Sequence, residues 1–123
     1  MNERGSQAYP VVWFEVMGQD ADRLRQFYGE LLGWQFREAH PMPYSDLLRD
    51  DGAPGIPGRI GQTGPGHPSW MTFYTMVPDL EAALERARGM GSSVLMPPVR
   101  LADTTIAVVS DPEGHPVGLC VSH

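Results

Sequence analysis

The sequence predicts an α+β domain built from two copies of one βαβββ unit. The first observation is a repeat: an apolar, β-rich run, an Asp, a helical stretch and a Gly occur in this order in residues 11–34 and again in residues 70–91. The second is the period, because Asp20 and Asp79 lie 59 positions apart. A repeat of this length indicates duplication of one supersecondary unit.

The first unit is expected to begin with a strand over residues 9–17, which is rich in Val, Trp, Phe and Tyr and apolar on both faces. Asp20 is a predicted helix N-cap and Gly33 a predicted C-cap. Between them one apolar stripe recurs with helical spacing: Leu24, Phe27, Tyr28 and Leu31. Two further strands are expected at 34–39 and 44–49. The segment 50–66, rich in Gly and Pro, predicts only a short fourth strand near 56–60.

The second unit follows the same plan, with a strand over 70–77 and a helix capped by Asp79. Its helical stripe is Leu80, Ala83, Leu84 and Ala87. The remaining strands are predicted at 94–96, where Pro97-Pro98 should halt the chain, at 104–109 and at 117–121. Asp111 opens a type I turn, Asp-Pro-Glu-Gly, and Asp51 stands 60 positions before it in the first unit.

The length of 123 residues suits one domain with its own core. We expect a disordered N-terminus at residues 1–8 and a single domain at 9–123. Within this domain, module one covers 9–60, a linker covers 61–68 and module two covers 69–122.

Composition excludes two classes of partner. The formal net charge is −6 and the few basic residues are scattered arginines, which argues against nucleic acid. No apolar run approaches the roughly 20 residues that span a bilayer, so no membrane association is expected. The N-terminal residues lack the apolar core of a signal peptide, and Cys120 is the single cysteine. A cytoplasmic location is therefore expected.

Several residues carry a resemblance to a known family: Asp20, Phe27-Tyr28, Leu32-Gly33-Trp34, Asp79 with Gly91, and the closing DPEGHPVGL from Asp111. In this ordered set the chain resembles the vicinal oxygen chelate superfamily, which includes glyoxalase I, bleomycin-resistance proteins and extradiol dioxygenases. The resemblance implies the glyoxalase/bleomycin resistance fold, in which two βαβββ modules form an open curved sheet around a cavity. It also implies a homodimer.

The metal enzymes of this family place one ligand on the first and one on the last strand of each module. The matching positions here are Trp13, Gly58, Thr72 and Gly118. An indole, a hydroxyl and two hydrogens do not form a catalytic metal site, which needs His, carboxylate or thiolate ligands. The metal-dependent activity is therefore not carried over, and neither a metal nor another cofactor is expected.

Strand alternation puts Trp13, Glu15 and Met17 on one face of the first strand. The resemblance makes this face and its counterparts concave, so that they line the cavity. The expected ligand-binding set is Trp13, Glu15, Met17, Thr72, Tyr74, Met76, Gly118 and Cys120. Such a lining suits a flat aromatic or apolar small molecule. Alternatively, these side chains simply fill the space between the sheets.

Glu15 is the sharpest catalytic candidate, because a carboxylate inside a β-run is costly unless paired. It is either a general acid/base or an anchor for a cationic ligand, or else a structural partner of an Arg, such as Arg49 or Arg59, or of a strand hydroxyl. Three functions remain open. The first is a metal-free small-molecule binding protein. The second is an enzyme of lyase, isomerase or dioxygenase type that uses Glu15, with Tyr74 as a donor, or a displaced metal site. The third is a structural or regulatory module with a filled cavity.

Overall fold

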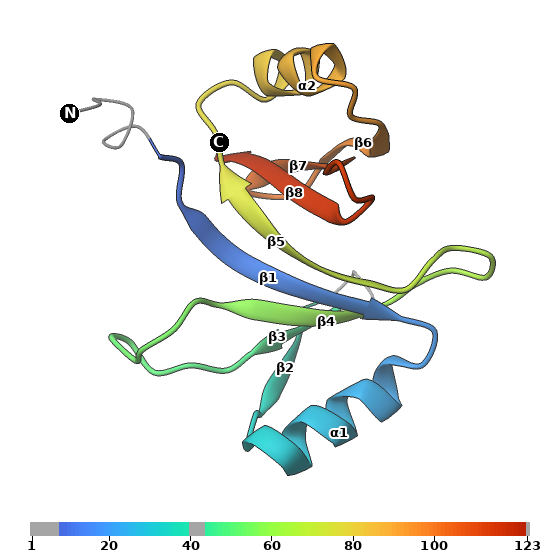
Figure 1. Ribbon diagram of the computed structural model, residues 1–123. Coiled ribbons are helices and arrows are strands. Elements are labelled where there is room, and N and C mark those ends of the chain that lie inside the picture. Colours follow the sequence, from blue (N-terminus) through green and yellow to red (C-terminus); the bar gives the residue numbers. More distant parts are fainter. Residues whose placement is uncertain (1–7, 40–43, 123) are drawn as a thin grey trace. The chain divides into compact units, whose positions relative to one another are not determined.

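The computed structural model describes residues 8–39 and 44–122, so nearly all of the predicted disordered segment 1–8 lies outside the described residues. The described chain forms eight strands and two helices in the order β1-α1-β2-β3-β4 and β5-α2-β6-β7-β8 (Figure 1). The predicted α+β class and the two βαβββ repeats are confirmed. No helix in the described ranges has the length and apolar character needed to cross a membrane.

The chain divides into two compact units, whose boundaries fall inside β1 and β5. The first unit comprises residues 13–72, and the second comprises residues up to 12 together with 73 onward. In the first unit the strand order is β2-β3-β4-β1, with β1 and β4 parallel. Its elements are β1 (Val11–Gly18), α1 (Ala21–Leu32), β2 (Phe36–Ala39), β3 (Tyr44–Leu47) and β4 (Gly58–Gln62).

The second unit repeats this arrangement with the strand order β5-β8-β7-β6, in which β5 and β8 are parallel. Its elements are β5 (Trp70–Met76), α2 (Leu80–Gly89), β6 (Val94–Arg100), β7 (Thr104–Ser110) and β8 (Pro116–Ser122). The core lies between α2 and the sheet, where Leu80 and Leu84 pack on Ala107 and Val109.

Both predicted helix starts are confirmed. The Asp20 carboxylate accepts a hydrogen bond from the Arg23 backbone N–H at 3.1 Å, and the Asp79 carboxylate accepts one from Ala82 at 3.0 Å. Gly33 ends α1 in the left-handed conformation with φ 74°. These caps satisfy backbone groups that the helix itself leaves unpaired.

The apolar stripe of α1 is only half used by the core of the first unit. Leu24 and Tyr28 pack against the buried residues Val16, Ala21 and Ile60. By contrast, Phe27 and Leu31 are 55% and 64% exposed. Helical spacing predicted the stripe, but not how much of it the sheet covers.

Several predicted strand bounds need correction. Pro97-Pro98 does not halt β6, which runs from Val94 to Arg100 with register shifts on either side of Met96. β6 is an edge strand, and an edge tolerates proline because the missing N–H is not needed in the ladder. The third strand ends at Leu47 rather than residue 49, and the Arg49 guanidinium instead donates to the carbonyls of Ala53 and Gly55 in the loop. The second strand begins at Phe36 rather than residue 34, and the fourth runs to Gln62, two residues into the predicted linker.

We expect Gly118→Ala to destabilise the protein by about 1–3 kcal/mol, as overpacking does. A Cβ at Gly118 would lie 2.6 Å from the Phe73 carbonyl oxygen and 2.5 Å from the Tyr74 ring, so the backbone must shift. Gly89→Ala is the matched control, since nothing lies within 4 Å of its added Cβ. Urea unfolding measures both. An equal midpoint for the two variants would contradict this account of Gly118.

Candidate functional site

The two faces of β1 have different neighbours, as the alternation predicted. Phe14 and Val16 pack into the core beneath α1. Glu15 lies on the opposite face, beside Arg59 of β4, because the parallel register sets Glu15 against Arg59 and Phe14 against Gly58. The candidate site of the first unit is built on this second face.

Glu15 is buried, with 3% of its surface exposed, and is held by two partners. The Nε and Nη2 atoms of Arg59 donate to its Oε1 at 3.3 and 3.1 Å. The indole Nε1 of Trp70 donates to its Oε2 at 3.2 Å. Paired in this way, the carboxylate avoids the high cost of an isolated buried charge. Of the predicted structural partners, Arg59 is the one that pairs with Glu15.

Arg59 is also enclosed by aromatic rings. The guanidinium carbon lies 3.8 Å from the centroid of the Tyr44 ring and 4.5 Å from that of the Trp13 ring. Both contacts are cation–π interactions, which gain strength when the cation is desolvated. We call Trp13, Glu15, Tyr44, Arg59 and Trp70 the Arg59 cluster.

The Tyr44 phenol is the polar group at the edge of the Arg59 cluster. Its pKa is raised above the ordinary value mainly by burial; the Arg59 charge opposes this rise and the Glu15 charge adds to it. The hydroxyl therefore stays protonated at neutral pH and is able to donate a hydrogen bond.

Two members of the Arg59 cluster, Tyr44 and Trp70, were not among the site residues predicted from the sequence. Trp70 shares the alternation of Thr72 and Tyr74 in β5, so the same period-two argument would have included it. Tyr44 gave no such signal. It reaches the cluster only through the pairing of β3 with β4, which sets Tyr44 opposite Gly61. A Cβ on Gly61 would lie 2.5 Å from the Tyr44 ring, so the glycine makes room for it.

The other predicted ligand-binding residues lie in two places. Thr72 belongs to the first unit and is 7% exposed. In the second unit Tyr74 pairs with Gly118, and Met76 pairs with Cys120. Tyr74 and Cys120 are 0% and 2% exposed, whereas Met76 is 37% exposed. Ligand contact by these residues stays a prediction.

The residues present do not fit the metal of the family's enzymes. Gly58 lies on the helix face, where its absent Cβ would meet the Phe14 ring at 2.1 Å, and the β4 residue on the face of Glu15 is Arg59. A guanidinium has no lone pair for a metal ion. Within 8–39 and 44–122, no three His, Cys, Asp or Glu side chains come together as a possible metal site.

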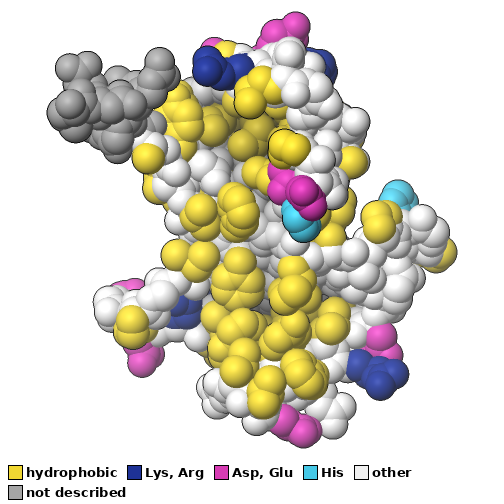
Figure 2. Space-filling model, viewed as in Figure 1, with side chains coloured by type: hydrophobic (Ala, Val, Ile, Leu, Met, Phe, Trp, Pro, Cys, Tyr) yellow, Lys and Arg dark blue, Asp and Glu magenta, His cyan; other side chains and the backbone are white. Residues whose placement is uncertain are grey.

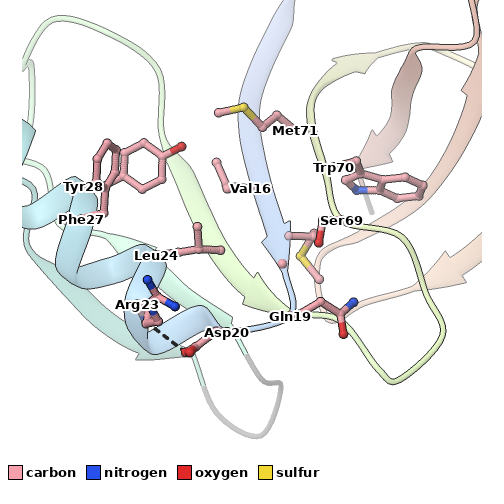
Figure 3. A pocket seen from close by; sticks show the side chains of 12 residues that line it. Val16, Gln19, Asp20, Arg23, Leu24, Phe27, Tyr28, Ser69, Trp70 and Met71 are labelled. Carbon is pink, nitrogen blue, oxygen red and sulfur yellow. Dashed lines mark hydrogen bonds between the residues drawn. The ribbon is translucent and has the colours of Figure 1, made fainter.

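A separate pocket of about 570 Å³ opens on the helix side of the first unit (Figure 3). Leu24, Phe27 and Tyr28 of α1 face Val16 of β1 and Met71 of β5 across it. The remaining lining residues are Met17, Gly18, Gln19, Asp20, Arg23, Ser69 and Trp70. The sequence predicts no ligand site on this side of the sheet.

Two βαβββ modules, each with its own helix and four paired strands, define a class of small α+β proteins built by duplication. The chain belongs to the Glyoxalase/Bleomycin resistance protein/Dioxygenase superfamily, whose family model matches residues 11–119. The predicted family and fold are thereby confirmed.

Curated relatives in Mycobacterium bovis and Mycobacterium tuberculosis are named CFP32 and provisionally described as glyoxylases. They are 27% identical over an alignment of 117 residues that covers 87% of this chain. The chain spans 43% of the length of these relatives.

Solved structures show the same fold. A superfamily member from Vibrio splendidus 12B01 is 19% identical, with a TM-score of 0.62 over 94% of this chain and 100% of the other. Methylmalonyl-CoA epimerase from Mycobacterium tuberculosis is 14% identical, with a TM-score of 0.56 over 92% and 87%. At these identities the likeness concerns the fold alone.

Glu15→Gln should lower the free energy of unfolding by about 3 kcal/mol, the low end of the range for breaking a buried ion pair. The variant leaves the Arg59 guanidinium, whose side chain is 13% exposed, without its counter-charge. Glu85→Gln breaks the exposed Arg88–Glu85 pair and should cost less than about 0.5 kcal/mol. Urea unfolding compares the two. Equal costs would show that the buried pair contributes no more than a surface pair.

Proposed function

We propose that the protein is a metal-free small-molecule binding protein whose ligand is flat and aromatic or apolar. The observation that carries this proposal is the Arg59 cluster. Its rings are held in place by a buried ion pair, and Trp13, Tyr44 and Trp70 are each only partly buried. Rigid aromatic surface with a few fixed polar groups is the usual composition of a small-molecule site.

Each member of the Arg59 cluster has a part in this proposal. The exposed parts of Trp13 and Trp70 offer stacking area, and such ring pairs contribute beyond simple area burial. Tyr44 offers a hydroxyl donor. Met17 is also half-buried, and its sulfur lies next to Gly61, as the Tyr44 ring does. Its flexible side chain can adapt to the shape of the ligand.

The geometry supports binding better than acid/base catalysis. Both oxygens of Glu15 already accept hydrogen bonds, from Arg59 and from Trp70. A general base needs a free lone pair aimed at the substrate, within hydrogen-bond reach. Glu15 in this arrangement positions rings rather than moving protons, and the enzyme alternative then requires a different group.

One observation favours the third function for part of the chain. The second-unit face that carries Tyr74 and Cys120 also carries Ile106 and Val108, and these four residues are at most 3% exposed. A face filled to this degree leaves no room for a ligand without rearrangement. We therefore assign the ligand contacts to Trp13, Met17, Tyr44 and Trp70, and a structural role to the second-unit set.

The same proposal includes a homodimer, a cytoplasmic location and no nucleic-acid partner. The family resemblance supports the dimer. A single cysteine, buried in the second unit, supports a reducing compartment. The net charge of −6 opposes binding to a phosphate backbone.

The test is a screen of two- and three-ring aromatic compounds against the Trp34→Phe protein, read by tryptophan fluorescence and melting temperature. Trp34 stacks on Tyr28 beneath α1, so its replacement leaves Trp13 and Trp70 of the Arg59 cluster as reporters. A true ligand should quench these two and raise the melting temperature.

In the same background Trp13→Leu should weaken a hit about tenfold, the worth of one aromatic contact. Tyr9→Leu is the control, because Tyr9 is an exposed ring of the second unit. Hits that bind the Trp13→Leu variant unchanged would contradict the site, and a screen without hits would favour the filled module.

Removal of metal should leave binding of the same hit unchanged. The protein is dialysed against EDTA, its metal content is measured per chain, and the ligand titration is repeated. The expected result follows from the lack of donors at Trp13, Gly58, Thr72 and Gly118. Affinity that falls after dialysis and returns with one added divalent ion would overturn the metal-free proposal.

A further inference from the structure

The pocket on the helix side of the first unit is built on Val16, which lies on the opposite face of β1 from Glu15, although Met17 and Trp70 also line it. Val16, 5% exposed, forms its floor, and Leu24 and Tyr28 rise beside it from α1 (Figure 3). Its volume of about 570 Å³ falls within the range of small-molecule sites, roughly 300–1,000 Å³.

Large apolar side chains at the rim are left open to water. Phe27 is 55% exposed and Met71 is 62% exposed, and both line the pocket. Figure 2 shows hydrophobic side chains gathered over the region of α1. A contiguous exposed apolar patch around a hollow marks a binding surface more often than scattered single residues do.

The polar groups of the pocket point to the head group of the ligand. No residue in the described ranges pairs with the Arg23 guanidinium, although the neighbouring Arg25 pairs with Asp22 and Ser45. Asp20 also lines the pocket, but its carboxylate caps α1, where the helix dipole stabilises it. The Tyr28 hydroxyl points into the pocket (Figure 3). One cation and one phenol donor therefore border an apolar hollow.

We propose that this pocket binds an amphiphilic monocarboxylate, with an apolar chain between Val16, Phe27 and Met71 and its carboxylate at Arg23. Arg–carboxylate pairing is the strong, directional match for a free guanidinium. A cationic head group would be repelled, and an uncharged one would leave Arg23 unused. This site shares Trp70 with the Arg59 cluster, but Val16, Phe27, Met71 and Arg23 lie outside that cluster, so the proposal stands whether or not the aromatic ligand is found.

The experiment is isothermal titration of the whole protein with three ten-carbon probes: sodium decanoate, 1-decanol and decyltrimethylammonium, each below its micelle concentration. Decanoate should bind most tightly. Arg23→Gln should weaken decanoate about tenfold, the low end for a hydrogen bond to a charged group, and leave decanol unchanged. Arg88→Gln is the control, an exposed arginine on α2.

A second pair of variants tests the apolar wall. Phe27→Ser should weaken both decanoate and decanol, whereas Leu31→Ser should weaken neither. Both side chains are exposed on α1, but only Phe27 lines the pocket. Because both are exposed, folding should survive, which circular dichroism verifies. Trp13→Leu should leave decanoate binding intact, which separates this site from the Arg59 cluster.

Four results would overturn the proposal: no binding of decanoate, equal binding of all three probes, equal effects of Phe27→Ser and Leu31→Ser, and dissociation of a dimer by Phe27→Ser. The last, seen by sedimentation velocity, would assign the apolar face to a second copy of this chain.

Discussion

The ion pair between Glu15 and Arg59 is the constraint on which the first unit depends. Two charges have left water, and their mutual attraction offsets the desolvation cost only in a well-bonded arrangement. The parallel register of β1 and β4 brings them together, and Trp70 satisfies the second carboxylate oxygen. The pair in turn fixes the rings of Trp13 and Tyr44 against the guanidinium. The strand register therefore forms the buried pair, and the pair orients the aromatic face.

Glycines in the strands serve this packing rather than leaving empty volume. The space a Cβ would take at Gly58 is filled by Phe14, at Gly61 by Tyr44 and Met17, and at Gly118 by Tyr74. The aromatic rings packed over these glycines differ in exposure between the two units. In the first, the ring beside Gly61 borders a cation and stays partly exposed; in the second, Tyr74 is wholly buried. Duplicated backbones have thus acquired one aromatic face and one filled face.

Caps, prolines and apolar periodicity in the sequence predicted which helices and strands form. They did not predict how these elements are paired or how much of each is buried. Asp20, Asp79 and Gly33 act at helix ends through bonds to residues within four positions, so their roles were readable directly. Pro97-Pro98 predicted a strand end, but the edge position of β6 removes the penalty. The stripe of α1 predicted an apolar face, yet only the packing of α1 in the folded unit decides that Leu24 and Tyr28 meet the core while Phe27 and Leu31 stay exposed.

By itself the sequence determined the duplicated βαβββ plan, the capped helices, the face of β1 that carries Glu15 and the lack of metal ligands at four positions. These follow from periodicity and side-chain chemistry, which act over a few residues. The tertiary structure alone decided that Arg59, 44 positions away, neutralises Glu15, that Tyr44 and Trp70 complete the cluster, and that a pocket opens beside Arg23. Such contacts depend on strand register and on the packing of α1, which no local pattern encodes.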